Sequence, residues 1–132
     1  MILTRAQYLG AKKRRFKNVP LPDGIDLGDG TLTKDASVRI RSLTQGELDR
    51  YEAGTYRVSK TGEKLLIDSS ALEEHRRRLL RLVLVDENDN TLLGPEDNDA
   101  VLETDGLLAS NVYREACKHC GIKELDEQAQ KN

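Results

Sequence analysis

Two cysteines near the carboxyl end come closest to a chemical motif in this chain. Cys117 and Cys120 flank Lys118 and His119, and thiols at this spacing can exchange disulfides or supply half of a zinc site. A structural zinc needs four ligands, yet the chain has no second cysteine pair and only one other histidine, His75. The pair also falls at the end of a predicted helix, where the helix dipole disfavours a thiolate. We therefore predict no metal or cofactor, with one cysteine in the core beside an incidental neighbour.

The segment Asp86–Asn90 begins like a calcium-binding loop. Oxygen-bearing side chains occupy its first, third and fifth positions, and Asp97 stands at the twelfth. The sixth position, where the sharp turn needs glycine, is Thr91, and the bidentate glutamate at the end is missing. A polar turn after a buried helix is the better interpretation.

A cluster of arginines on one predicted helix offers a basic surface. With the basic segment 12–17 it could contact nucleic acid. Proteins that bind single strands also use stacking aromatics, which are scarce here, and the acidic region 86–105 would repel phosphate. The simplest interpretation is a solvated helix face whose arginine stems cover apolar neighbours. As a hypothesis, the partner-binding residues are Arg39, Arg41, Arg76, Arg77, Arg78 and Arg81.

Catalysis finds little support in the residue pattern. His75 lies between charged residues and has no evident nucleophile as a partner. Ser69 and Ser70 are better explained as the start of a helix, and no glycine-rich phosphate loop is present in the sequence. We predict that the protein is not an enzyme and has no catalytic residues.

Composition suits one small domain over residues 1–132. Hydrophobic residues make up 37% and charged residues 33%, so the core must be economical and the surface highly charged. No apolar run approaches the length of a membrane span and no signal peptide is evident, which favours the cytoplasm. Residues 1–20 contain six bases and no acid, whereas residues 86–105 contain eight acids and no base. Such patches can meet within one molecule, between copies or with a partner.

The elements of the first half follow from local patterns. Alternating Val38 and Ile40 predict a strand within 36–42, to pair with an earlier strand at 14–21 across a loop at 22–35. Thr44 stands three residues before Glu47, the spacing of a capping box, so a helix should run to about Ala53 and end at Gly54 in the usual C′ role. A shorter helix is predicted from Thr4 to about residue 13.

The second half reads as mainly helical. A short hairpin at 56–58 and 64–67 precedes the strongest helix, about 70–85, which the spacing of Ser70 and Glu73 would cap. After the turn come a short extended piece at 91–93, a helix at about 95–103 led by Pro95, and a last helix at 105–120 ended by Gly121. The predicted fold class is α+β: a small N-terminal antiparallel β-hairpin or sheet (1–43), a mainly helical part (44–121) and a frayed tail (122–132).

Several segments in this order resemble one family. They are the opening Met1–Gln7, Val19-Pro20 before a loop, the strand and "L-T-x-x-E" box at 38–49, the apolar helix at 79–87 leading to a "V-D-E" turn and Leu92-Leu93, Pro95-Glu96-Asp97 before a helix, and a final helix ending in Gly121-Ile122. Together they are similar to the tail assembly chaperones of long-tailed phages and prophages. The long loop at 22–35, the glycine-free turn at 88–90 and the cysteine pair depart from the family pattern.

The resemblance implies a non-catalytic role. Proteins of this family bind the long, helical and aggregation-prone tape measure protein before the tail tube polymerises, and many relatives also have an extended form made by a programmed frameshift. The expected partner is therefore a tape measure protein in the host bacterial cytoplasm, with the chaperone absent from the mature virion and no membrane involved. Copies could also associate head to tail through acidic and basic patches. A small nucleic-acid-binding or regulatory protein, and a Cys117/Cys120 metal or redox module, stay open as alternatives.

Overall fold

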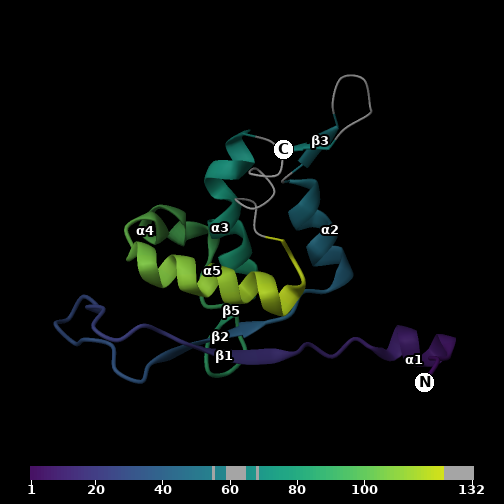
Figure 1. The fold of residues 1–132 in the computed structure, drawn as a ribbon, viewed down its shortest axis with the longest axis horizontal. Coiled ribbons are helices and arrows are strands. Elements are labelled where there is room, and N and C mark those ends of the chain that lie inside the picture. The colour runs from purple at the N-terminus through teal and green to yellow at the C-terminus, as the bar shows by residue number, and fades with distance from the viewer. Residues whose placement is uncertain (55, 59–64, 68, 124–132) are drawn as a thin grey trace.

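The computed structural model of the chain describes residues 1–54, 56–58, 65–67 and 69–123, with side chains described for 1–54 and 74–123. Within these residues a small antiparallel sheet early in the chain lies against a group of helices (Figure 1), which confirms the predicted α+β class. The elements are α1 Arg5–Gly10, β1 Phe16–Pro20, β2 Ser37–Arg41, α2 Gln45–Ala53, β3 Tyr56–Val58, β4 Leu65–Ile67, α3 Ser69–Val83, β5 Leu84–Val85, a 3-10 turn at Pro95–Asp97, α4 Asn98–Leu102 and α5 Gly106–Cys120.

The main sheet has the strand order β1-β2-β5 among the described residues, and both pairings are antiparallel. Val19 lies opposite Val38, and Lys17 lies opposite Ile40. The predicted pairing of the first two strands across the loop is therefore confirmed. Paired residues share one face of a sheet, and on this face Val19 and Ile40 are fully buried. Helix α5 covers the same face, because it contacts both β1 and β2.

The core forms where α3 and α5 pack together above the sheet. Leu79 and Val83 of α3 meet Val112 and Ala116 of α5, and all four are buried. Val112 and Ala116 stand four residues apart, so they lie on one face of α5. Among the residues whose side chains are described, the tyrosines buried in the core are Tyr51 and Tyr113, with 3% and 1% of their surface exposed.

Side-chain caps set the helix starts that the sequence indicated. The Thr44 hydroxyl accepts from the Glu47 backbone N–H, and the Glu47 carboxylate accepts from the Thr44 N–H at 2.9 Å. Thr4 and Gln7 repeat this capping box at α1. Asp105 caps α5 by accepting from the Leu108 N–H. Each cap satisfies helix-end donors that would otherwise have no partner within the helix.

The loop at 22–35 is held by its own polar side chains. The Asp26 carboxylate accepts from the backbone N–H groups of Gly28 and Gly30. Thr33 is buried and bonds twice: its hydroxyl donates to the Pro22 carbonyl and accepts from the Ile25 N–H. The loop extends beyond the far end of the two strands from α1 (Figure 1). Its shape therefore comes from hydrogen bonds close to the backbone rather than from an apolar core.

The helix expected to run to Val85 ends at Val83 instead. Leu84 and Val85 form β5, and they pair with Ile40 and Arg39 of β2. A run of apolar residues on all sides suits a buried strand as well as a buried helix, so its periodicity does not separate the two. The open edge of β2 decides the matter, because pairing satisfies the backbone groups of both segments.

Four smaller expectations also need correction. Helix α1 ends at Gly10 rather than at Lys13. Ser70 lies inside α3, so it does not occupy the N-cap position. The helix predicted at about 95–103 is a 3-10 turn led by Pro95, followed by α4. Gly54 follows α2 with a φ of −78°, outside the left-handed region, and a Cβ there would collide with the Arg78 guanidinium.

Other predictions have a simpler outcome. The pairing of β3 with β4 confirms the predicted hairpin strands, while its turn and the tail at 124–132 lie outside the described residues. Gly121 ends α5 in the left-handed conformation with a φ of 70°, as a C′ glycine does. The residues after Val85 form the predicted polar turn, with Asp89 N–H donating to the Asp86 carbonyl.

We predict that Ile40→Ala lowers the free energy of unfolding by about 2–5 kcal/mol, because it leaves a cavity under α5. The matched variant Ile40→Val should cost only about 0.5–1.5 kcal/mol. Urea denaturation followed by circular dichroism measures both. Equal losses for the two variants would contradict the placement of Ile40 at the centre of the core.

Candidate functional site

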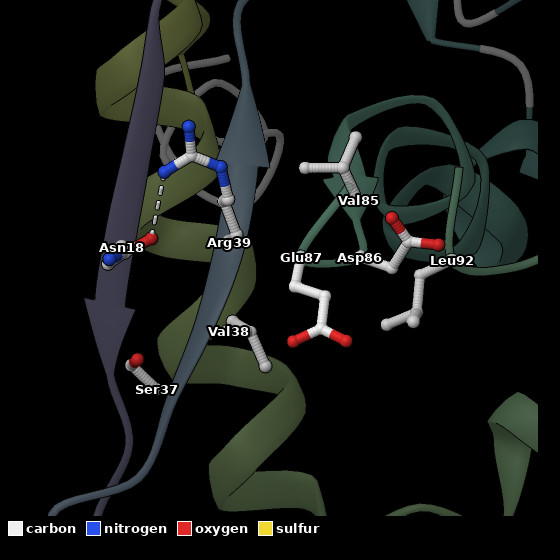
Figure 2. Close-up of a pocket in the computed structure, with 8 residues that line it drawn as sticks. All are labelled: Asn18, Ser37, Val38, Arg39, Val85, Asp86, Glu87 and Leu92. Atoms are coloured by element: carbon white, nitrogen blue, oxygen red, sulfur yellow. Dashed lines mark hydrogen bonds between the residues drawn. The ribbon is translucent and has the colours of Figure 1, made fainter. Parts of the chain in front are cut away.

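A groove lies between the first half of β2, at residues 37–39, and the turn that follows β5. It has a volume of about 570 Å³, and we call it the β2–β5 groove. Its lining residues are Asn18, Ser37, Val38, Arg39, Val85, Asp86, Glu87 and Leu92 (Figure 2). Val38, Val85 and Leu92 give it an apolar lining, while Asp86 and Glu87 place carboxylates beside them. The groove therefore combines apolar surface with negative charge.

Arg39 stands at one side of the groove, but its charge is already matched. Its Nε donates to Asp89 Oδ1 at 2.7 Å, and its Nη1 donates to Asn18 Oδ1 at 3.2 Å. The guanidinium carbon also lies 4.7 Å from the centre of the Phe16 ring. Figure 2 shows this side chain directed toward Asn18, away from Leu92. The groove consequently keeps the negative charge of Asp86 and Glu87.

The turn at 86–90 uses its leading carboxylate to hold its own backbone. Asp86 Oδ1 accepts from the N–H groups of Asn88 and Asn90 at 2.8 and 3.1 Å. Asp89 adopts a φ of 65° and pairs with Arg39. Asp86, the first of the oxygen-bearing groups that suggested a calcium loop, is thus engaged in an Asx-type turn.

Arg41 belongs to a second cluster of charges at the other end of β2. Its Nε donates to the Leu82 carbonyl at 2.8 Å, and its Nη2 lies 3.7 Å from Glu47 Oε2. Arg14 forms a two-pronged ion pair with the same carboxylate at 2.6 and 3.0 Å. Arg14 also donates to the Ser42 carbonyl. This Glu47 cluster joins the approach to β1, the end of β2 and the start of α2.

The hydrogen bonds from Arg14 lower the pKa of Glu47 to about 2. The Thr44 N–H and the charges of Arg14 and Arg41 act in the same direction, and burial of the carboxylate opposes them. The sequence had marked Glu47 only as a helix cap. Its long-range partners leave no local signal, because Arg14 lies 33 residues away.

The arginines of α3 also bond within the molecule. Arg76 donates to Ser110 Oγ and lies over the Tyr113 ring, and Arg78 donates to the Tyr51 carbonyl and lies over the Tyr51 ring. The other two reach α4: Arg81 donates to Asn98 Oδ1 at 3.1 Å, and Arg77 donates to the Asn98 carbonyl. These four guanidinium groups therefore tie α3 to α2, α4 and α5.

The six predicted partner-binding arginines lie on two elements. Arg39 and Arg41 lie on β2, whereas the other four lie along α3, and all six contact acceptors within the chain. Whether any of them binds a partner stays a prediction. Each is intermediate in burial, so part of every side chain is covered by the fold.

The cysteine pair divides as the sequence suggested. Cys117 is buried in the core, and Cys120 is half-buried beside the Arg41 carbonyl. Burial raises the pKa of the Cys120 thiol, which disfavours the reactive thiolate. His119 lies elsewhere: its Nε2 is 3.0 Å from the Arg15 carbonyl oxygen. Among the described residues, no group of three or more histidine, cysteine or acidic side chains is placed to hold a metal ion.

His75 is a core residue. Only 6% of its surface is exposed, and its ring meets that of Tyr113 edge-on with the centroids 5.2 Å apart. The sequence had placed it between charged neighbours without anticipating this aromatic contact.

The first thirteen residues form an exposed arm that sequence reasoning missed. Every residue from 1 to 13 is exposed, including Ile2 at 96% and Tyr8 at 68%. Helix α1 lies at one end of the long axis of the molecule, away from the helical layer (Figure 1). Five of the ten large exposed hydrophobic residues in the described chain lie in this N-terminal arm, namely Met1, Ile2, Leu3, Tyr8 and Leu9. The sequence predicted only a helix in this segment.

Comparison with protein-family models, with curated proteins and with solved structures found no match. In the part of the chain that the structure describes, no helix is long and apolar enough to cross a membrane.

We predict that Glu47 makes stability depend on acid pH. Its pKa in the folded state lies below the ordinary value of 4.5, so its contribution is complete above that value and is lost as the pH falls toward about 2. The contribution should be on the order of 2 kcal/mol. Glu47→Gln should remove it at neutral pH and flatten the pH profile of the unfolding free energy between these limits.

The matched control is Glu115→Gln, which alters a more exposed carboxylate paired with Lys17 at 3.0 Å. An exposed pair contributes little, so this variant should keep most of the wild-type profile. A Glu47→Gln profile as steep as that of the wild type would count against the Glu47 cluster.

We also predict that Arg78 matters for stability. Arg78→Ala removes the hydrogen bond to the Tyr51 carbonyl and the contact with its ring, and should lower the unfolding free energy by about 1.5–3 kcal/mol. Arg5→Ala removes the same side chain from the exposed arm and should change it by less than about 0.5 kcal/mol. Thermal denaturation of both variants compares them, and equal shifts would exclude the internal role of Arg78.

Proposed function

We propose that the protein is a non-catalytic tail assembly chaperone of a long-tailed phage or prophage, which binds the tape measure protein and keeps it soluble while the tail tube forms. The proposal starts from the resemblance carried by residues 38–49 and 79–93. The observation that carries it is the direct contact between these two segments in the fold. Under this proposal the protein acts in the host cytoplasm and is left out of the mature virion.

The contact between the two segments has several parts. Ile40 pairs with Leu84 in the sheet, and the Arg41 Nε donates to the Leu82 carbonyl. Arg39 forms an ion pair with Asp89 in the turn. The residues that carry the resemblance therefore belong to one structural unit, which supports a shared fold more strongly than separate short similarities would.

A chaperone for a helical client needs exposed apolar side chains, because it must cover the apolar stripe of that helix. Leu102 at the end of α4 and Leu107 at the start of α5 are 60% and 63% exposed. Leu102 lies on the same short helix as Asn98, to which Arg77 and Arg81 of α3 both donate. We propose this α4–α5 corner as the surface that contacts the tape measure protein.

The alternative of nucleic-acid binding gains no specific support. The basic side chains of α3 that would contact phosphate donate to acceptors within the chain instead. Phosphate contacts would have to compete with these bonds.

We predict that co-expression with the long helical tape measure protein of the same phage makes that protein soluble and that the two co-purify. Leu102→Ser/Leu107→Ser should reduce co-purification at least about tenfold, since two exposed apolar contacts are lost. The matched control Leu27→Ser/Leu32→Ser changes two other exposed leucines, in the loop at 22–35, and should behave like the wild type.

Different outcomes would contradict the chaperone function and the proposed contact surface. A tape measure protein that stays insoluble with the wild-type chain would overturn the chaperone function. Full co-purification with the Leu102→Ser/Leu107→Ser variant would leave the function standing and exclude the α4–α5 corner as its surface.

A further inference from the structure

The N-terminal arm is shaped as a docking segment. Its helix begins with a full capping box, in which the side chains of Thr4 and Gln7 each accept from the backbone N–H of the other residue. Its apolar side chains nevertheless face solvent. Residues 1–13 carry Arg5, Lys12 and Lys13 as positive groups, with no acidic residue. An ordered helix that exposes both apolar and basic side chains suits an apolar, acidic surface.

The β2–β5 groove offers that chemistry. Its carboxylates at Asp86 and Glu87 lie beside Val38, Val85 and Leu92, and the charge of Arg39 is balanced by Asp89. Leu92 is 49% exposed, so a ligand there gains apolar burial. A segment with apolar and cationic side chains fits the groove better than an acidic one.

The edge of β2 adds backbone groups to the groove. Leu21 N–H donates to the Ala36 carbonyl, and Ser42 N–H donates to the Arg15 carbonyl. In an antiparallel ladder the residues between such pairs direct their N–H and C=O groups to the opposite side. Ser37 therefore directs its backbone groups away from β1, toward the side where β5 ends. Because β5 pairs only with Arg39 and Ile40 in β2, Ser37 lies beyond its end.

The arm of the same molecule is poorly placed to enter this groove. The arm leads into β1 at Phe16, whereas the groove lies beside Val38, which is opposite Val19 near the other end of β1. Strand β1 is also the outer strand, so the arm would have to cross both β1 and β2. Figure 1 shows α1 directed away from β5. A second copy of the chain meets neither obstacle.

We propose that the N-terminal arm of one copy docks in the β2–β5 groove of a second copy. The apolar side chains of the arm cover Val38 and Leu92, and its basic residues meet Asp86 and Glu87. Arm and groove are different surfaces of one molecule, so the contact is heterologous and repeats head to tail. The contact involves no tape measure protein, so it can be tested on the purified chain alone.

Sedimentation velocity of the full chain tests the proposal. The wild type should form larger species as its concentration rises, and high salt should weaken them because the charged part of the contact is screened. The groove variant Glu87→Lys/Leu92→Lys and the arm variant Ile2→Ser/Leu3→Ser/Leu9→Ser should each associate at least about tenfold more weakly. All five substituted positions are exposed.

A matched control keeps the composition of the groove variant. Glu103→Lys/Leu107→Lys makes the same two exchanges at exposed positions of the α4–α5 corner and should associate like the wild type. It also separates arm docking from the proposed chaperone function. This variant should lose binding to the tape measure protein while it keeps self-association.

Mixing the two impaired variants gives the sharpest outcome. The groove variant still has an arm and the arm variant still has a groove, so an equimolar mixture should form a 1:1 dimer and stop there. A wild-type chain that stays monomeric at high concentration and low salt would overturn the proposal. So would a groove variant that associates as strongly as the wild type, or a mixture that stays monomeric.

Cross-linking keeps the proposal testable if a variant fails to fold. A photoreactive benzophenone side chain at position 3 should link to residues 84–92 of another copy in a mixture of ¹⁴N- and ¹⁵N-labelled chains. Links confined to one copy, or directed to another region, would contradict arm docking in the groove.

Discussion

The Glu47 carboxylate is the interaction on which the rest of the arrangement depends. It caps α2 through the Thr44 N–H, receives both prongs of Arg14 and lies near Arg41. Arg41 in turn donates to the last turn of α3 through the Leu82 carbonyl. One half-buried charge thus sets where the arm leaves the body, where β2 ends and how the sheet meets the helices. A carboxylate with this many donors stays ionised, which keeps all of these links in place together.

Arginine has a structural role throughout the body of this molecule. A guanidinium has several donors in a fixed plane, so it can bond carbonyl oxygens of neighbouring elements while its stem covers apolar surface. The α3 arginines use this geometry toward α2, α4 and α5. A high content of charged residues therefore does not mean an equally charged binding surface. The exposed apolar side chains gather instead in the N-terminal arm and at a few scattered leucines.

Local signals explain why much of the fold could be predicted. The Thr44 and Glu47 spacing, the alternation at 38–41 and Gly121 act over a few residues, and each produced the element expected. Strand β5 could not be predicted, because Leu84 and Val85 become a strand only when β2 lies beside them. The partners of Arg14 and Arg78 are equally non-local. The arm escaped notice because its sequence suits a helix, and nothing in that sequence shows whether a body covers it.

The junction between α3 and β5 has a mechanical consequence. The helix passes into the strand at Val83 and Leu84 with no loop between them. Because no loop separates the two elements, the orientation of β5 follows that of α3. Strand β5 in turn borders the groove. The same helix is tied to α4 through Asn98. One continuous segment, α3 with β5, therefore connects α4 to a wall of the groove.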